Sequence, residues 1–330
     1  MNNKIKPRVA LIYGGRGYER EVSVRGKEHI LPLIDRDRYD VYPIYIDAGG
    51  QWLYEGEEIF LANRSFYCPK RKFYQQLDLA FPLLHGDYGE DGMVQGALEC
   101  AKIPYVGSDY KASAVCRDKY FVKTVAESLG IPALPYLLLL ESEGVDYAVR
   151  RVEESFIYPI VVKPTCLGSS VGVYLADTKE ALRHSLKKIF EISGRVIAEP
   201  YLEGKRELEC SYFSTKGKEL FTNPGEILCD GLYGYEEKYH KSCVELAIRA
   251  DIEPSVCEAV REYSRRLVRT LGVRDISRVD FLFSKGKLYF NEINTFPGFT
   301  EGSLYARMIE AVGITERELL CRLIDNRLSE

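Results

Sequence analysis

Two strand-like runs near the C-terminal end, RVDFLF and KLYFNEIN, carry side chains that could hold a divalent cation. The short polar stretch between them predicts a hairpin, and side chains alternate between the two faces of a strand. A turn centred on Gly286 then places Asp280 opposite Glu292, and Arg278 opposite Asn294, with opposed Cβ atoms about 4.5–5.5 Å apart. Such oxygen ligands suit Mg²⁺ or Mn²⁺ beside nucleotide phosphates. A surface hairpin with a salt-bridged polar face is the alternative.

A second stretch, VVKPTCLGSSVGV, predicts a strand, a loop rich in glycine and serine, and another strand. The loop offers backbone N–H groups and the hydroxyls of Ser169 and Ser170 to an anion, and Lys163 adds a positive charge. Lys119, on a preceding helix, could add another. The Walker pattern G-x-x-x-x-G-K-[ST] is missing from the sequence. The stretch therefore indicates either a phosphate site of another fold or a tight turn capped by its serines.

A glycine turn near the N-terminus, LIYGGRGYEREVS, follows a third strand-like run. In the dinucleotide fingerprint G-x-G-x-x-G, a pyrophosphate sits on the start of the next helix. Counted from Gly15, the third glycine position holds Arg20, and an anion there would face Glu19 and Glu21. The sequence therefore excludes a nicotinamide dehydrogenase of this type. Pairing with the helix dipole would explain Glu21, and it is the alternative for Glu19.

The elements that position these residues change along the chain. RVALIY, YDVYPIYI, LDLAFPLL and GMVQGALECAKI alternate strand-like and helical patterns, which predicts a parallel sheet with crossover helices over residues 1–115. A helix is expected from residue 116 to Gly130. YPIVVKP, SVGVYLA and RVIAEPYL follow with little helix between the first two, which predicts a small antiparallel sheet. A further helix is expected over residues 254–271, because Pro254 precedes apolar residues spaced by three and four.

The composition excludes several classes of protein. The chain has 330 residues, of which 46% are hydrophobic, and this is enough to form two or three domains with their own cores. Its net charge is −4. Basic and acidic residues are mixed throughout, so we expect no nucleic-acid partner. No apolar run approaches the roughly 20 residues of a membrane helix, and the N-terminal residues lack a signal-peptide pattern. The nine cysteines include no C-x-x-C pair, as expected for unpaired thiols in a reducing cytoplasm.

Seven stretches of the chain, in order, resemble the D-alanine–D-alanine ligases, a family of the ATP-grasp superfamily. These stretches are GGRGYEREVS, LHGDYGEDGMVQGALE, YVGSDYKASAVCRDK, VVKPTCLGSSVGV, EEKYH, SRVDFLF and NEINTFPGFTEGSLY. The resemblance implies a mixed α/β and α+β fold of the ATP-grasp type. In this fold a Rossmann-like N-terminal domain, residues 1–115, binds the first substrate, and two α+β subdomains, residues 116–205 and 206–330, clasp ATP.

The resemblance also implies a reaction. The enzyme would be a carbon–nitrogen ligase that joins two D-alanines through an acyl phosphate, with ATP as a substrate and two Mg²⁺ or Mn²⁺ ions. Its product would supply the peptidoglycan precursor. The implied protein is a cytoplasmic homodimer that acts on small molecules, with neither a nucleic acid nor a membrane as partner.

Site residues are carried over position by position. The residues implied to bind ATP are Lys119, Lys163, Ser169, Ser170, Glu199, Leu202, Glu207 and Lys238. The residues implied to bind metal are Asp280, Glu292 and Asn294. The residues implied to bind the amino acids are Glu19, His85, Arg278, Ser303 and Leu304. The residues implied to be catalytic are Glu19, Ser169, Tyr239, Arg278 and Gly298.

Within this set, Glu19 would hold the ammonium of the first D-alanine. Tyr239 would meet Glu19 and Ser169 in a closed state, and Arg278 with the backbone N–H of Gly298 would stabilise an oxyanion. A buried histidine is the alternative for His85, and an exposed loop aromatic is the alternative for Tyr239.

The match departs from the family at two places. One residue differs in length before Glu207, and Glu301-Gly302 stand where the family usually has Ser-His. The second change lies beside the pocket for the second substrate, so D-serine remains an alternative to D-alanine there. A nucleotide or amino-acid sensor that has lost catalysis is a further alternative, against which the complete set of charged site residues argues.

Overall fold

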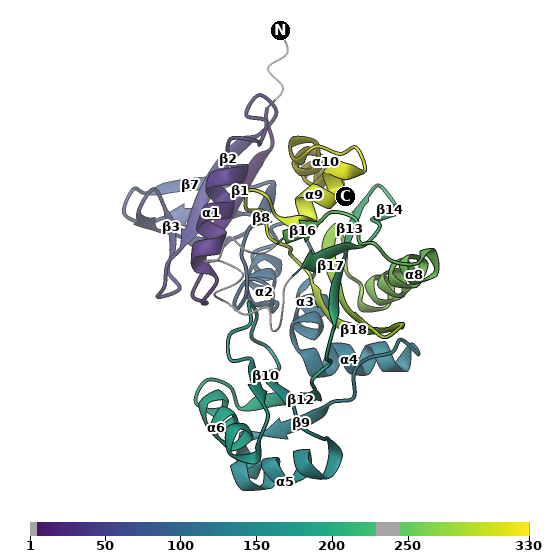
Figure 1. Ribbon diagram of the computed structural model, residues 1–330. Coiled ribbons are helices and arrows are strands. Elements are labelled where there is room, and N and C mark those ends of the chain that lie inside the picture. Colours follow the sequence, from purple (N-terminus) through teal and green to yellow (C-terminus); the bar gives the residue numbers. More distant parts are fainter. Residues whose placement is uncertain (1–4, 229–244, 330) are drawn as a thin grey trace.

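The computed structural model describes residues 5–228 and 245–329 of the protein. Figure 1 shows an N-terminal region, a central region that projects from the rest, and a C-terminal region whose last helices return to the N-terminal sheet. Each region is built on its own β-sheet, the first mainly parallel and the other two antiparallel. This combination is the mixed α/β and α+β fold expected from the sequence.

The N-terminal region has a five-stranded sheet in the order β4–β3–β2–β1–β8. The central strand β1 runs parallel to both β2 and β8, which confirms the parallel sheet expected from the sequence. The antiparallel strands β3 and β4 extend one edge, and a separate three-stranded sheet, β5–β6–β7, lies beside it. The elements are β1 (Arg8–Gly14), α1 (Arg20–Ile30), β2 (Asp40–Ile46), β3 (Trp52–Tyr54), β4 (Glu57–Glu58), β5 (Phe60–Ala62), β6 (Ser65–Cys68), β7 (Phe73–Gln76), β8 (Leu79–Pro82) and α2 (Met93–Cys100).

The central region has an antiparallel sheet in the order β11–β10–β12–β9. Helices α5 and α6 pack on this sheet around a core that includes Leu139, Val152, Val162 and Leu186. The small antiparallel sheet expected from the sequence is therefore present. The elements are α3 (Tyr110–Arg117), α4 (Lys119–Ser128), β9 (Leu137–Leu140), the 3₁₀ turn Glu141–Glu143, α5 (Val145–Ser155), β10 (Ile160–Pro164), β11 (Tyr174–Ala176), α6 (Lys179–Phe190) and β12 (Arg195–Pro200).

The single helix expected from residue 116 to Gly130 is divided in the structure. Asp118 has an extended backbone, and its carboxylate accepts the N–H groups of Tyr120 and Phe121 at 2.9 and 3.3 Å. An acidic side chain in this position is a strong helix N-cap, so a new helix begins at Lys119. The break gives Lys119 a place at the first turn of α4, facing the centre of the molecule.

The C-terminal region has an antiparallel sheet in the order β16–β15–β13–β17–β18, with β14 paired to β13. The expected helix over residues 254–271 is confirmed, with Pro254 in its first turn and Gly272 as a left-handed C-cap. The elements are β13 (Arg206–Thr215), β14 (Lys218–Phe221), β15 (Gly225–Leu228), β16 (Glu245–Ala247), α8 (Pro254–Leu271), β17 (Ile276–Ser284), β18 (Lys287–Asn294), α9 (Leu304–Ala311) and α10 (Glu316–Leu328).

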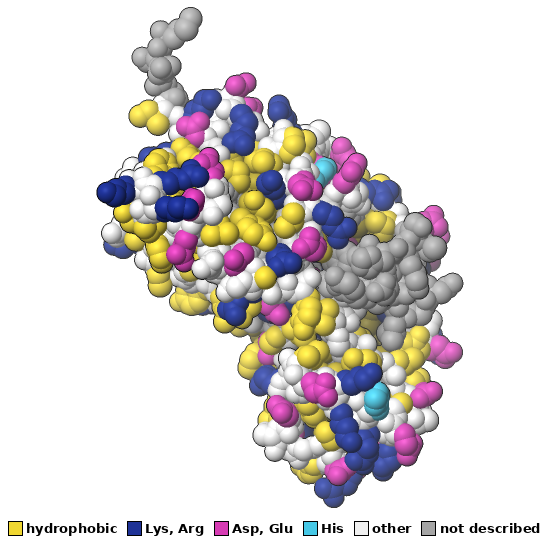
Figure 2. All heavy atoms as spheres, turned by 90° about the vertical axis from the view of Figure 1, so that its left-hand side faces the viewer, with side chains coloured by type: hydrophobic (Ala, Val, Ile, Leu, Met, Phe, Trp, Pro, Cys, Tyr) yellow, Lys and Arg dark blue, Asp and Glu magenta, His cyan; other side chains and the backbone are white. Residues whose placement is uncertain are grey.

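The regions share buried contacts that fix them around the centre. One apolar cluster joins Leu11 and Phe81 of the N-terminal sheet to Leu320 and Leu323 of α10, so the last helix covers one face of the first sheet (Figure 1). On the face shown in Figure 2, basic and acidic side chains are interspersed over the described surface. Among the described residues, none of the helices has both the length and the apolar character needed to cross a bilayer.

Candidate active site

A cleft of about 450 Å³ lies where the three regions meet. Its walls come from the start of α1, the start of α4, the loop after β10, the end of β12, and the strands β13, β17 and β18. Of the site residues expected from the sequence, those in the described part of the chain all line this cleft: Glu19, His85, Lys119, Lys163, Ser169, Ser170, Glu199, Leu202, Glu207, Arg278, Asp280, Glu292, Asn294, Gly298, Ser303 and Leu304. Lys238 and Tyr239 lie outside the described residues.

The hairpin of β17 and β18 has the expected pairs, but an irregularity produces them. Asp280 pairs with Glu292 and Arg278 with Asn294, whereas Phe281 pairs with Phe290. The shift leaves Asn291 as an extra residue on β18, a β-bulge that bends the strand at the site. The turn itself is one residue shorter than expected, because Ser284 pairs with Lys287. The two residues between them, Lys285 and Gly286, both have positive φ, as in tight hairpin turns.

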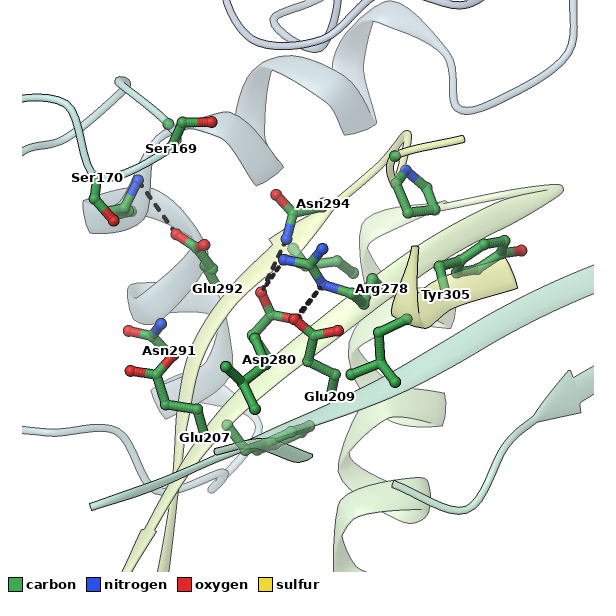
Figure 3. A pocket seen from close by; sticks show the side chains of 18 of the residues that line it. Ser169, Ser170, Glu207, Glu209, Arg278, Asp280, Asn291, Glu292, Asn294 and Tyr305 are labelled. Atoms are coloured by element: carbon green, nitrogen blue, oxygen red, sulfur yellow. Dashed lines mark hydrogen bonds and ion pairs between the residues drawn. The ribbon is translucent and has the colours of Figure 1, made fainter. Parts of the chain in front are cut away.

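The two acids have different neighbours (Figure 3). Asp280 accepts hydrogen bonds from Arg278 at 2.7 and 2.8 Å and from the amide nitrogen of Asn294 at 3.0 Å. Glu292 lies 3.3 Å from Lys119 Nζ. Since Asn294 donates through its nitrogen, its oxygen points away from Asp280. Two carboxylates and an amide oxygen form the hard donor set that Mg²⁺ and Mn²⁺ prefer.

This donor set fits a metal shared with a ligand better than a closed cage. Among the described residues, no three histidine, cysteine or acidic side chains converge as a metal-binding group. An ion at Asp280 and Glu292 would therefore take its remaining ligands from Asn294, water or a bound phosphate, as Mg²⁺ commonly does.

Two buried lysines approach the acids from the other wall of the cleft. Lys119 donates to the carbonyl of Leu167 at 2.8 Å, and burial lowers its pKa although Glu292 acts in the opposite direction. Burial also opposes the charge of Lys163, but the carboxylate of Glu199, 2.7 Å away, outweighs it and raises the pKa of Lys163. Cationic side chains facing two acids can hold the oxygens of a polyphosphate.

The loop after β10 covers this part of the cleft. Ser169 and Ser170 both have positive φ, and Gly172 follows with φ 72°. Successive residues of this kind turn backbone N–H groups toward a common concavity, which suits an anion. The hydroxyl of Ser169 donates to the carboxylate of Glu19, so the loop and the glycine turn meet. Leu202 and Glu207 line the far end of the cleft, where Glu207 pairs with Lys205.

Glu19 directs its carboxylate into the cleft although it stands at the N-terminus of α1. In the described chain its side chain makes no capping hydrogen bond to the helix. Gly86 has positive φ, and a Cβ atom there would lie 2.1 Å from the Glu19 carboxylate, so glycine at this position leaves the carboxylate its place. Glu21, in contrast, lies in the exposed first turn of α1, as helix-dipole pairing predicts.

Arg117 and Glu90 are pocket residues that the sequence did not reveal. The guanidinium of Arg117 lies 3.0 Å from Asp87 and 3.7 Å from both Glu19 and Glu90. Burial raises the pKa of Glu90 to about 7, and Arg117 acts against this rise. The only sequence signal was the position of Arg117 directly before the Asp118-Lys119 pair. The net negative cluster suits an ammonium group.

His85 is buried, with 6% of its surface exposed. Burial lowers its pKa, so the ring is neutral at pH 7. Its Nε2 atom has no hydrogen-bond partner among the described residues, and the residue lines the cleft beside Glu19. A buried nitrogen of this kind is poised to bind a ligand.

The opposite end of the cleft is formed around Arg278. Glu209, which the sequence did not single out, lies 3.2 Å from Arg278 Nε. The signal was available, because Glu207 and Glu209 alternate on β13 and share a face. Ser303 caps α9 through its hydroxyl, with Ala306 N–H 3.3 Å away. Beside Gly298 there is open space among the described residues, which leaves room for a substrate.

Comparison with known proteins supports the arrangement. The family models described as D-ala D-ala ligase N-terminus and C-terminus match residues 8–108 and 125–325. The D-alanine–D-alanine ligase of Streptococcus pneumoniae serotype 2 (strain D39 / NCTC 7466) is 36% identical, over 97% of this chain and 96% of that protein.

Two solved structures resemble the whole chain. D-alanyl-alanine synthetase A from Vibrio cholerae O1 biovar eltor is 30% identical with a TM-score of 0.90, over 99% of this chain and 100% of that one. The VanG D-Ala:D-Ser ligase from Enterococcus faecalis is 28% identical with a TM-score of 0.87, over 98% and 99%. The curated matches do not favour the D-serine alternative. The chain therefore belongs to the D-alanine–D-alanine ligase family, whose members are ATP-dependent ligases of the ATP-grasp fold.

Proposed function

We propose that the protein joins two D-alanine molecules at the expense of ATP to supply D-alanyl-D-alanine for peptidoglycan precursor. One observation carries the proposal: Asp280 and Glu292 face each other across a hairpin, with Lys119 beside them and Glu19 in the same cleft. The cleft thus has a phosphate end and an ammonium end, which a ligase of amino acids requires.

In the first step the carboxylate of the first D-alanine attacks the γ-phosphorus of ATP, and the bond to ADP breaks. Lys119 and Lys163 bind and orient the phosphates, since phosphoryl transfer depends mostly on positioning and on charge neutralisation. Two Mg²⁺ or Mn²⁺ ions held by Asp280, Glu292 and Asn294 would supply further neutralisation there. The remaining ATP-binding set is Ser169, Ser170, Glu199, Leu202, Glu207 and Lys238.

Glu19 binds the ammonium of the first D-alanine. The hydroxyl of Ser169 fixes the carboxylate of Glu19 through its hydrogen bond, and Arg117 offsets part of the negative charge around Glu19. The neutral ring of His85 completes this end. Together these contacts hold the substrate carboxylate toward the phosphate end, and such positioning can supply a large part of a rate enhancement.

In the second step the amine of the second D-alanine attacks the acyl phosphate. The carbon–nitrogen bond forms, the bond to phosphate breaks, and the amine loses a proton. Asp280 and Glu209 hold the guanidinium of Arg278, which with the backbone N–H of Gly298 stabilises the oxyanion. Ser303 and Leu304 bind the second substrate. Tyr239 belongs to the same proposal as a contact of Glu19 and Ser169 in the closed enzyme.

The same proposal includes a cytoplasmic homodimer, and membership of the family supports it. Each chain would have three domains, at residues 1–115, 116–205 and 206–330. Sedimentation equilibrium tests the dimer. A single species at the mass of one chain would contradict it.

Phosphate release from ATP tests the reaction. With Mg²⁺ present, D-alanine should accelerate release strongly, and mass spectrometry should identify the dipeptide. Addition of D-serine together with D-alanine tests the alternative second substrate. If the main product is the mixed dipeptide, the second site takes D-serine rather than D-alanine. Nucleotide binding without turnover would instead support the sensor.

A further inference from the structure

Lys123 is a fully buried lysine, with 0% of its surface exposed, to which the reaction above gives no part. It lies on α4 four residues after Lys119, so both side chains share one face of the helix. Its Nζ atom is 2.8 Å from Glu199 Oε1 and donates to the carbonyl of Phe290 at 3.3 Å. A buried lysine needs such partners, since an isolated buried charge is costly.

Glu199 is shared between two lysines. Its second oxygen, Oε2, lies 2.7 Å from Lys163 Nζ, and only 2% of the residue is exposed. The pairing of β10 and β12 places Val161 beside Glu199, so Lys163, two residues along, lies on the same face as Glu199. The three side chains form a buried row in the order Lys123, Glu199, Lys163.

The row has a net positive charge only when both lysines contribute. Lys163 and Glu199 alone would cancel, and an anion in the cleft would then meet little positive charge from Lys163. Lys123 offsets the carboxylate, so that the row keeps one positive charge at the end that lines the cleft. The row also fixes the geometry, because each oxygen of Glu199 is held by a different ammonium group.

Burial and the ion pairs act in opposite directions on the pKa values of Glu199 and Lys123. Burial alone would raise the pKa of Glu199, but the two ammonium groups outweigh it and lower that pKa. Burial lowers the pKa of Lys123, and Glu199 opposes this effect.

We propose that Lys123 is a positioning residue for ATP: without touching the nucleotide, it holds Glu199 and offsets its charge, so that Lys163 keeps its direction and the row keeps a net positive charge for the phosphates. Because the ligand of Lys163 is taken to be a phosphate of ATP, this role rests on the proposed function. In the part of the chain that the structure describes, Lys123 makes no contact with the amino-acid end of the cleft. Its replacement should therefore affect the binding of ATP and not that of D-alanine.

Replacing the charge tests the role directly. Lys123→Met should raise the KM for ATP about tenfold and leave the KM for D-alanine within about twofold. The matched control is Lys179→Met, which removes a half-exposed lysine of α6 that pairs with Glu153 of α5. It should change neither KM. If Lys123→Met does not fold, Lys123→Gln removes the same charge while keeping a hydrogen-bond donor for Glu199 and Phe290.

A double variant separates positioning from packing. In Glu199→Gln the carboxylate through which Lys123 acts is gone, so adding Lys123→Met should change ATP affinity by less than about threefold. A lysine that only fills space would cause the same loss in both backgrounds. An unchanged KM for ATP in a folded Lys123→Met protein, or equal losses in the two backgrounds, would overturn the proposal.

Calorimetry with Mg²⁺ and ADP keeps this test independent of turnover. If the wild-type protein binds ADP but forms no dipeptide, the proposed reaction fails, and the ADP affinities of the variants still decide the role of Lys123. If the wild-type protein binds no nucleotide, both proposals fail.

Discussion

Substitution of Glu292 can test the proposed metal and phosphate sites without disturbing the fold. Glu292 pairs with Asp280 across the hairpin and lies 3.3 Å from Lys119. Glu292→Gln keeps the shape of the side chain but removes a charged ligand, so we expect kcat to fall by at least about 10²-fold, as when an electrostatic stabiliser is lost. Phosphate release measures the effect, and circular dichroism should show an unchanged fold.

The control for Glu292→Gln is Glu258→Gln, which removes an exposed carboxylate paired with Arg261 on α8. It should leave kcat unchanged. Near-normal activity in Glu292→Gln would mean that the metal ligands have been assigned wrongly.

Glu90 gives the site a predictable pH dependence of stability. Burial raises its pKa from 4.5 to about 7, so the folded protein binds more protons than the unfolded chain between these values. Stability contributed by this group is therefore complete below about pH 4.5 and is lost as the pH rises through about 7. Glu90→Gln cannot titrate and should abolish this loss.

We therefore expect Glu90→Gln to be more stable than the wild-type protein at pH 8, by about 3 kcal/mol, and equally stable near pH 4.5. Urea unfolding at several pH values measures the difference. A difference that stays constant with pH would show that Glu90 does not titrate in this interval.

At the scale of secondary structure, the N-cap of α4 controls where Lys119 points. Asp118 accepts the N–H groups of Tyr120 and Phe121, and it also lies 3.3 Å from Arg195. Asp118→Ala should lower the free energy of unfolding by about 1–2 kcal/mol and raise the KM for ATP, because the first turn of the helix loses its anchor.

Asp118→Asn is the matched variant, since asparagine caps helices nearly as well as aspartate. It should recover most of the stability and of the ATP affinity in the same unfolding and kinetic measurements. Equal losses in both variants would assign the effect to the charge of Asp118 rather than to the cap.

The hairpin shows how far sequence reasoning reaches at this scale. Alternation along two strands was sufficient to predict that Asp280 faces Glu292. The bulge at Asn291 could not be predicted, because a tighter turn and an extra residue together give the same pairing at the acids. The break at Asp118 could not be predicted either, because the apolar pattern continues on both sides of the cap.

Residues that act through others were the least predictable from the sequence. Lys123, Arg117 and Glu209 are distant in sequence from the acids and bases that they contact. Their roles depend on how three sheets meet, and a lysine within an amphipathic helix is normally solvent-exposed. The motif residues, in contrast, lie on strands, in turns or at the start of a helix, where local geometry already directs them to the cleft.

At the scale of the whole molecule, a buried charge network ties the C-terminus to the N-terminal region. Asp275, fully buried before β17, accepts Gly107 N–H and Arg327 Nε, both at 2.7 Å, and Asn326 Nδ2 at 3.3 Å. Burial raises the pKa of Asp275, and Arg327 opposes this rise. The network joins α10, β17 and the segment before α3, so it holds the walls of the cleft in place from outside.

Arg327→Met would leave the carboxylate of Asp275 buried without its main cationic partner. Breaking one side of a buried ion pair typically costs about 3–5 kcal/mol, and urea unfolding at pH 7 should show a loss of this size. The surface pair of Arg322 and Glu318 on the same helix offers the control, because Arg322→Met should cost less than about 0.5 kcal/mol. The loss in Arg327→Met should shrink as the pH falls, because burial raises the pKa of Asp275 and its carboxylate then takes up a proton. A loss independent of pH would assign it to packing of the arginine stem instead.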